Sequence, residues 1–161
     1  MQFTREQLKT ILNLPGPLSL VKIELTDADL SFANLTSANL SDSKLKGANL
    51  TSANLTGANL IGANLIGANL TGANLLLANL SAAQLRGADL TEAFLHYANL
   101  REAFLTKTKL YKATLYEAAL EGADLSEAEL QETDLDRAKY DQKTKWLDGF
   151  DLKAAGAILV T

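Results

Sequence analysis

Residues 48–70 read ANLTSANLTGANLIGANLIGANL, and the five-residue unit of this stretch extends far beyond it in both directions. Leucine stands at every fifth position from Leu20 to Leu135, 24 times without interruption. Alanine precedes most of these leucines by two residues, and asparagine or aspartate often stands between them. A short repeat of fixed length is typical of a solenoid, in which each unit buries its apolar side chains against its neighbours.

A period of five fits neither a straight α-helix nor a flat strand. Successive leucines would step by about 140° around a helix, and on a strand they would alternate between opposite faces. The chain must therefore turn once in every pentad. If each short extended segment bends in the same direction, every leucine faces a shared interior, and the alanine two residues earlier does so too. The remaining three residues of each pentad then face solvent.

The residue two positions after each leucine marks the corner between segments. Seven of the ten glycines occupy this slot, and glycine is favoured in turns. Phe32, Leu77 and Tyr97 occupy the same slot, and bulky side chains are disfavoured at positive φ. This composition predicts that the corner does not require a positive φ.

The tandem A-N-L and A-D-L units, followed by Ser, Thr or Gly, closely resemble the pentapeptide-repeat family over residues 18–140. The resemblance implies an all-β solenoid, a right-handed quadrilateral β-helix with four pentads to a coil and about six coils. The repeats themselves are too alike to distinguish four sides from three. Residues 140–151 also resemble a C-terminal extension that is common in cyanobacterial members of the family.

Both ends of the chain depart from the repeat, as an open β-helix requires, because an uncovered coil exposes leucines and unpaired backbone groups. We expect short helical caps at the two ends. Residues 1–17 form the predicted N-terminal cap, with a capping box at Thr4 and Gln7 and an apolar helical stripe that ends before Pro15.

Residues 141–161 form the predicted C-terminal cap, beyond the single β-helical domain of residues 18–140. Trp146, Phe150 and the apolar run 157–160 are expected to cover the last coil. A dimerising function of this segment is an alternative to a purely covering one.

Composition points to one domain of 161 residues without cysteine, so neither disulfides nor thiolate metal sites contribute. No apolar run approaches the roughly 20 residues of a membrane span, and we expect no membrane insertion. The first residues lack the basic start and apolar core of a signal peptide, which favours a cytoplasmic location.

Catalytic constellations are absent from the sequence. His96 is the only histidine and stands in an outward slot, so a histidine-based relay or a multi-histidine metal site has too few members. Carboxylates are plentiful near the C-terminal end of the repeat, but acid–base work requires a cleft that shifts their pKa values, and a packed rod offers none. The sequence predicts no enzyme activity, no cofactor, no metal and no small-molecule substrate.

Charge is distributed unevenly along the chain. No charged residue or histidine stands between Lys46 and Arg86, a stretch of 39 residues. The net charge is −4, and direct nucleic-acid binding would call for a basic stripe. The preferred interpretation is a non-enzymatic structural or protein-interaction scaffold whose protein partner the sequence does not identify.

Two alternatives remain at this stage. Some pentapeptide-repeat proteins inhibit or protect DNA gyrase by resembling duplex DNA, and such mimicry requires acidic groups along the whole rod in place of phosphates. An ice-binding surface is the other alternative, built on a column of hydroxyl residues spaced by 20, namely Ser31, Thr51, Thr71 and Thr91.

One group of outward positions is apolar where other pentads carry small or polar residues. With coils of 20 residues these side chains fall at one side and its adjoining corner, spaced by about 4.8 Å per coil. They form the candidate protein contact, through which a homodimer is also possible, although aromatic ladders can instead stabilise neighbouring coils. The candidate residues are Leu76, Leu77, Phe94, His96, Tyr97 and Tyr116.

Overall fold

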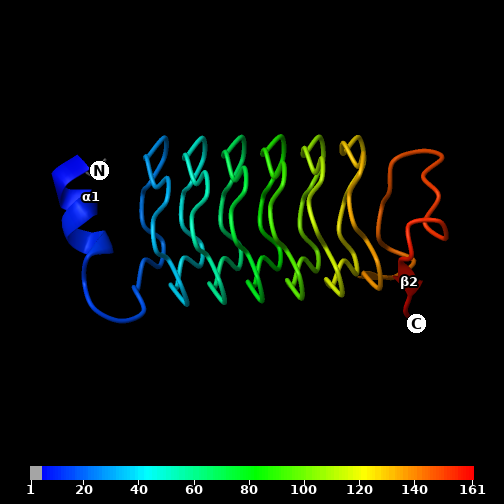
Figure 1. Cartoon of the computed structure of the whole chain (residues 1–161), viewed down its shortest axis with the longest axis horizontal. Coiled ribbons are helices and arrows are strands. Elements are labelled where there is room, and N and C mark those ends of the chain that lie inside the picture. The colour runs from blue at the N-terminus through cyan, green and yellow to red at the C-terminus, as the bar shows by residue number, and fades with distance from the viewer. Residues whose placement is uncertain (1–4) are drawn as a thin grey trace.

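The computed structural model describes residues 5–161 as a rod of stacked coils (Figure 1). Helix α1 (Arg5–Leu12) lies at one end of the rod. Two short strands, β1 (Lys139–Tyr140) and β2 (Ile158–Leu159), lie at the other. Thr4, the first residue of the predicted capping box, lies outside the described residues.

Each coil contains 20 residues. Isolated parallel bridges join the residue before each leucine to its counterpart one coil later, beginning with Ser19 and Asn39. The backbone hydrogen bonds repeat in the same way, since the Leu50 N–H donates to the Asn69 carbonyl at 2.7 Å. Four pentads make one such coil, which confirms the quadrilateral β-helix expected from the repeat.

The repeat leucines and alanines fill the interior of the rod. Every repeat leucine from Leu30 to Leu125 is at most 1% exposed, and full burial of one leucine contributes about 1.5–3 kcal/mol. Thr108 replaces alanine in the inner slot and is also fully buried. Its Oγ1 donates to the Leu85 carbonyl at 2.9 Å, so the hydroxyl is satisfied inside the apolar core.

The corners correct one sequence-based prediction. Phe32, Leu77 and Tyr97 all have a φ of 59°, like the glycines in the same slot, so the corner does require a positive φ. The turn is closed by the Ala78 N–H, which donates to the Leu75 carbonyl at 2.9 Å. Positive φ at the third turn residue is the type II pattern. It also directs the Leu77 N–H toward the next coil, and this gain outweighs the steric cost of a side chain.

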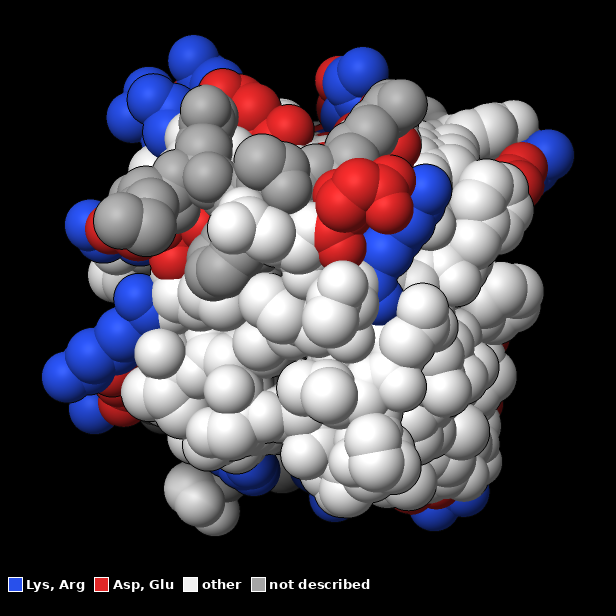
Figure 2. Space-filling view, turned by 90° about the vertical axis from the view of Figure 1, so that its left-hand side faces the viewer, with Lys and Arg blue, Asp and Glu red and all other residues white. Residues whose placement is uncertain are grey.

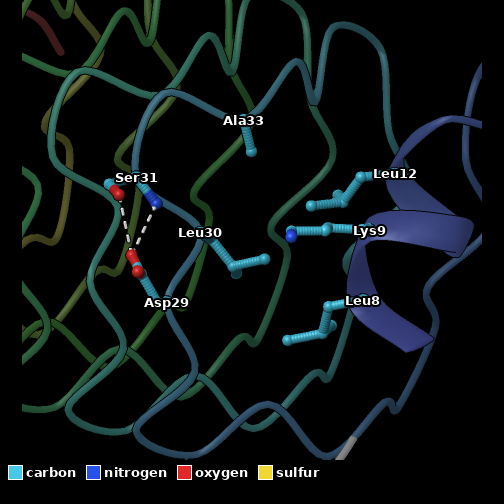
Figure 3. A pocket seen from close by; sticks show the side chains of 7 residues that line it. All are labelled: Leu8, Lys9, Leu12, Asp29, Leu30, Ser31 and Ala33. Atoms are coloured by element: carbon cyan, nitrogen blue, oxygen red, sulfur yellow. Dashed lines mark hydrogen bonds between the residues drawn. The ribbon is translucent and has the colours of Figure 1, made fainter. Parts of the chain in front are cut away.

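Helix α1 covers the N-terminal end of the core. Its Leu8 is buried, and Leu12 packs against the same apolar cluster. Figure 3 shows these side chains directed toward Leu30 of the first coil. A pocket of about 320 Å³ remains between the helix and that coil, so the cover is incomplete.

The C-terminal cap differs from the helical cap that the sequence predicts. Residues 141–161, all of them described, contain no helix. The Trp146 ring stacks on Phe150, with centroids 5.8 Å apart, and both residues pack against the core as expected.

The run 157–160 does not cover the core but extends the ladder. Strand β2 pairs in parallel with β1, and the Ile158 N–H donates to the Ala138 carbonyl at 2.8 Å. Ile158 and Leu159 remain 43% and 52% exposed. An open strand edge offers hydrogen-bond partners that a helix would leave unpaired, which favours the extended form.

Candidate functional site

Opposite charges stack along the rod. Most of the ion pairs among the described residues join side chains one coil apart in a single column, and each is worth at most about 1 kcal/mol at an exposed site. Their main effect is therefore local neutralisation of the carboxylates. The pairs are Lys44–Glu24, Arg101–Glu121, Lys107–Glu127, Lys109–Asp89, Lys112–Glu132, Arg137–Glu117 and, 21 residues apart, Lys145–Asp124.

Two adjacent sides of the rod, and the corner between them, carry no formal charge over five coils. We call this surface the neutral stripe. The 39-residue charge void seen in the sequence is only its middle part, because coils of 20 residues align further uncharged residues above and below. The neutral stripe consists of Asn34, Asn54, Asn74, Phe94 and Thr114 on one side, Thr36, Ser37, Thr56, Gly57, Leu76, Leu77, His96, Tyr97 and Tyr116 at the corner, and Asn39, Asn59, Asn79, Asn99 and Ala119 on the next side.

Charged side chains are also unevenly placed in the view from the N-terminal end. Figure 2 shows them gathered at the top and left of the molecule, while the lower right is mostly uncharged.

The neutral stripe is apolar at its centre. Leu77, Phe94 and Tyr97 are 61%, 51% and 47% exposed. Leu76 and His96 are half-buried and, together with Asn74 and Phe94, line a shallow depression of about 210 Å³. The predicted contact residues therefore do lie together, on one side and its corner.

Tyr116 lies in the next coil and supports the others. Its ring lies 6.0 Å from the His96 ring and 5.8 Å, edge-on, from the Tyr97 ring. The Tyr116 hydroxyl accepts a hydrogen bond from Arg137 at 3.2 Å, and Arg137 also pairs with Glu117. The Tyr116 bond and the Glu117 charge raise the pKa of Arg137 above its ordinary value. Tyr116 is thus engaged within the fold, whereas Leu77 and Tyr97 have exposed side chains.

Leu77 and Tyr97 are costly residues at their positions. A side chain in the left-handed region costs about 1–2 kcal/mol, and glycine fills seven other corners of the same kind at no such cost. Strained conformations that persist in a fold gather at functional sites. The strain at this corner therefore supports a contact function for the apolar side chains.

A further exposed aromatic residue was missed by sequence reasoning. Phe104 is 53% exposed and lines a depression of about 300 Å³ with Ile66, Gln84 and Arg86. Its signal was available, because it stands in an outward slot ten residues after Phe94. The two phenylalanines lie on opposite sides of the rod.

The hydroxyl column proposed for ice binding is engaged within the protein. Thr51 Oγ1 and Thr71 Oγ1 each donate to the preceding asparagine Oδ1 at 2.7 Å, and Ser31 Oγ donates to Asp29 at the same distance. These hydroxyl hydrogens are not directed to solvent, which weakens the ice-binding alternative.

Two searches for other kinds of site were negative within residues 5–161. No group of three or more histidine, cysteine or acidic side chains is placed to hold a metal ion. In the same part of the chain, every helix is too short or too polar to cross a membrane.

Comparison with known proteins identifies the repeat. A family model described as pentapeptide repeats matches residues 23–60, 58–96, 78–115, 90–126 and 105–139. No curated protein sequence matches the chain significantly.

Two solved cyanobacterial structures are similar to this chain. HetL from Nostoc sp. strain PCC 7120, a pentapeptide repeat protein involved in heterocyst differentiation regulation, is 35% identical over 87% of this chain, with a TM-score of 0.60. Rfr23, a pentapeptide repeat protein from Cyanothece 51142, is 39% identical over 58% of this chain, with a TM-score of 0.58. The chain spans 63% and 64% of these two proteins, less than two thirds of each.

A more distant structure shares the fold alone. Trypsin-treated QnrB1, a plasmid-mediated fluoroquinolone resistance protein, is 18% identical, with a TM-score of 0.63 over 89% of this chain and 82% of its own.

Proposed function

We propose that this chain, which belongs to the pentapeptide-repeat family and has its right-handed quadrilateral β-helix, is a non-enzymatic scaffold that binds another protein. The contact is centred on Leu77, Phe94 and Tyr97 within the neutral stripe.

The exposed apolar residues at the strained corner carry this proposal. Leu77 and Tyr97 combine a positive φ with exposed fractions of 61% and 47%, so they are unfavourable to the free protein twice over. Protein interfaces are enriched in aromatic residues and depleted of charge at their centre. A rigid β-helix presents such side chains without an ordering cost, which favours binding.

Mimicry of DNA at gyrase is not favoured by the charge distribution. A mimic needs unpaired acidic groups along the rod, whereas Glu121, Glu127 and Glu132 each pair with a basic residue of the same column. The neutral stripe leaves two sides of the rod without any phosphate-like charge. The similarity to QnrB1 extends to the fold only.

The experiment compares two variants of the immobilised protein. Phe94→Ser combined with Tyr97→Ser is expected to abolish recovery of a protein partner from the source organism while shifting the melting temperature only slightly. Buried aromatic anchors commonly account for most of the binding energy at an interface. A large loss of thermal stability with recovery intact would show instead that the aromatic residues stabilise the coils.

Phe104→Ser provides the matched control. It removes the same side chain, at almost the same exposure, from the opposite side of the rod. Recovery that falls equally for Phe104→Ser would place the contact elsewhere or make it non-specific.

A further inference from the structure

We infer that the partner bound at the neutral stripe is a second copy of this chain, lying side by side with the first and antiparallel to it. This inference rests on the proposed contact function of the stripe and adds the identity and orientation of the occupant.

Charge selects the face on which two copies meet. The chain has a net charge of −4, so two copies repel each other at long range. The two remaining sides carry charged columns such as Asp89 with Lys109. Contact there would set like charges of the two copies against each other or require their desolvation, which is costly. The neutral stripe allows approach without either penalty.

The C-terminal limit of the stripe selects the antiparallel orientation. Glu117, Asp134 and Asp136 follow the stripe in its own columns. A parallel arrangement would place these carboxylates opposite their own copies. An antiparallel arrangement places them opposite the uncharged first coils of the other chain.

The periodicity then fixes the register. Closed dimers have a two-fold axis, and each residue pair occurs twice. With the axis at Tyr97, the middle of the apolar centre, Leu77 lies near Tyr116 of the second copy. One coil further out, Thr56 lies opposite Asp136 of the second copy, so a small polar residue meets the carboxylate.

The size of the stripe predicts a weak dimer. Five coils at about 4.8 Å each give a length of about 20–25 Å, and two sides of three residues give a width of about 20 Å. The total buried area is then near or below about 1,200 Å², the range of transient complexes. We expect dissociation in the micromolar range.

Sedimentation of the whole chain between about 1 and about 500 µM tests the dimer, given this expected weakness. The average mass should rise from 17.3 kDa toward twice that value. Phe94→Glu should remain monomeric throughout, because it places a charge in the apolar centre, whereas Phe104→Glu should associate like the unchanged chain. A chain that stays monomeric, or equal association of both variants, overturns the inference.

The absence of cysteine allows the orientation to be tested directly. Thr56→Cys mixed with Asp136→Cys should form a disulfide-linked dimer under mild oxidation, and the mixture should cross-link far faster than either variant alone. Faster cross-linking of Thr56→Cys with itself overturns the antiparallel arrangement. A monomeric chain that still recovers another protein through Phe94 and Tyr97 refutes the second copy but leaves the proposed contact function intact.

Discussion

Phe94 and Phe104 occupy equivalent slots on opposite sides of one coil, ten residues apart, and are exposed almost equally, at 51% and 53%. Their surroundings differ. Phe94 lies beside Leu76 and His96 in the neutral stripe, whereas Phe104 lies beside Arg86. The pair therefore separates the effect of an exposed ring from the effect of the surface around it.

The interior leucines should dominate stability. Leu65→Ala is expected to cost about 2–5 kcal/mol in the free energy of unfolding, because the fully buried side chain leaves a cavity between rigid coils. Asn64→Ala should cost about 1 kcal/mol, since it removes one hydrogen bond, from the Ile66 N–H to the Asn64 Oδ1 at 3.2 Å. Denaturant unfolding measures both. A larger loss for Asn64→Ala would contradict the inward placement of the leucines.

The C-terminal cap should matter more for solubility than for the fold. Deletion of residues 141–161 removes Trp146, Phe150 and β2, which leaves the last coil as an open apolar edge. We expect association at micromolar concentration with an unchanged β-type circular dichroism spectrum. Light scattering that reports a monomer would refute the covering function.

Acid should weaken the junction between the last coil and its cap. Burial raises the pKa of Asp141, but bonds donated by the backbone N–H groups of Gly122, Lys143 and Thr144 and by the Thr144 hydroxyl outweigh it, so this pKa lies below its ordinary value. A lowered pKa in the folded state stabilises the fold at neutral pH, and the contribution is lost as the pH falls below about 3.9 and through the lower folded-state pKa.

Asp141→Asn removes this titration. The variant should be less stable than the unchanged chain at neutral pH, and its free energy of unfolding should fall less on acidification. Urea unfolding at about pH 7 and about pH 3 compares the two chains across this range. Equal pH dependence of the two would show that Asp141 does not contribute.

Gyrase supercoiling should be unaffected by the purified protein at concentrations well above that of the enzyme. The carboxylates that would imitate phosphates are paired along their columns, as in Arg101–Glu121 at 2.7 Å. Potent inhibition would contradict this expectation, and the acidic residues near the C-terminal end would then be the first to mutate.

The repeat allowed the interior to be predicted from sequence, because each position of the pentad has a fixed direction once the chain turns at every fifth residue. The number of sides came from family resemblance, and the 20-residue bridges confirm it. The column pairing of charges, such as Lys109 with Asp89, needs that coil length before it becomes visible.

Other features were not accessible from local preference. The positive φ of Leu77 contradicts what a branched side chain favours, because the backbone ladder between coils sets the corner geometry. Strand β2 could not be anticipated, since its partner β1 is 19 residues away and the pairing departs from the 20-residue register.

The free energy of unfolding of Leu77→Gly tests most directly the claim that the strained corner serves a contact and not the fold. Relief of left-handed strain of about 1–2 kcal/mol offsets the greater freedom of glycine in the unfolded chain, about 0.5–1 kcal/mol, and little buried area is lost from a side chain that is 61% exposed. The account predicts a change within about 1 kcal/mol of the unchanged chain. A loss of more than about 2 kcal/mol would show that Leu77 stabilises the coils and would contradict the account.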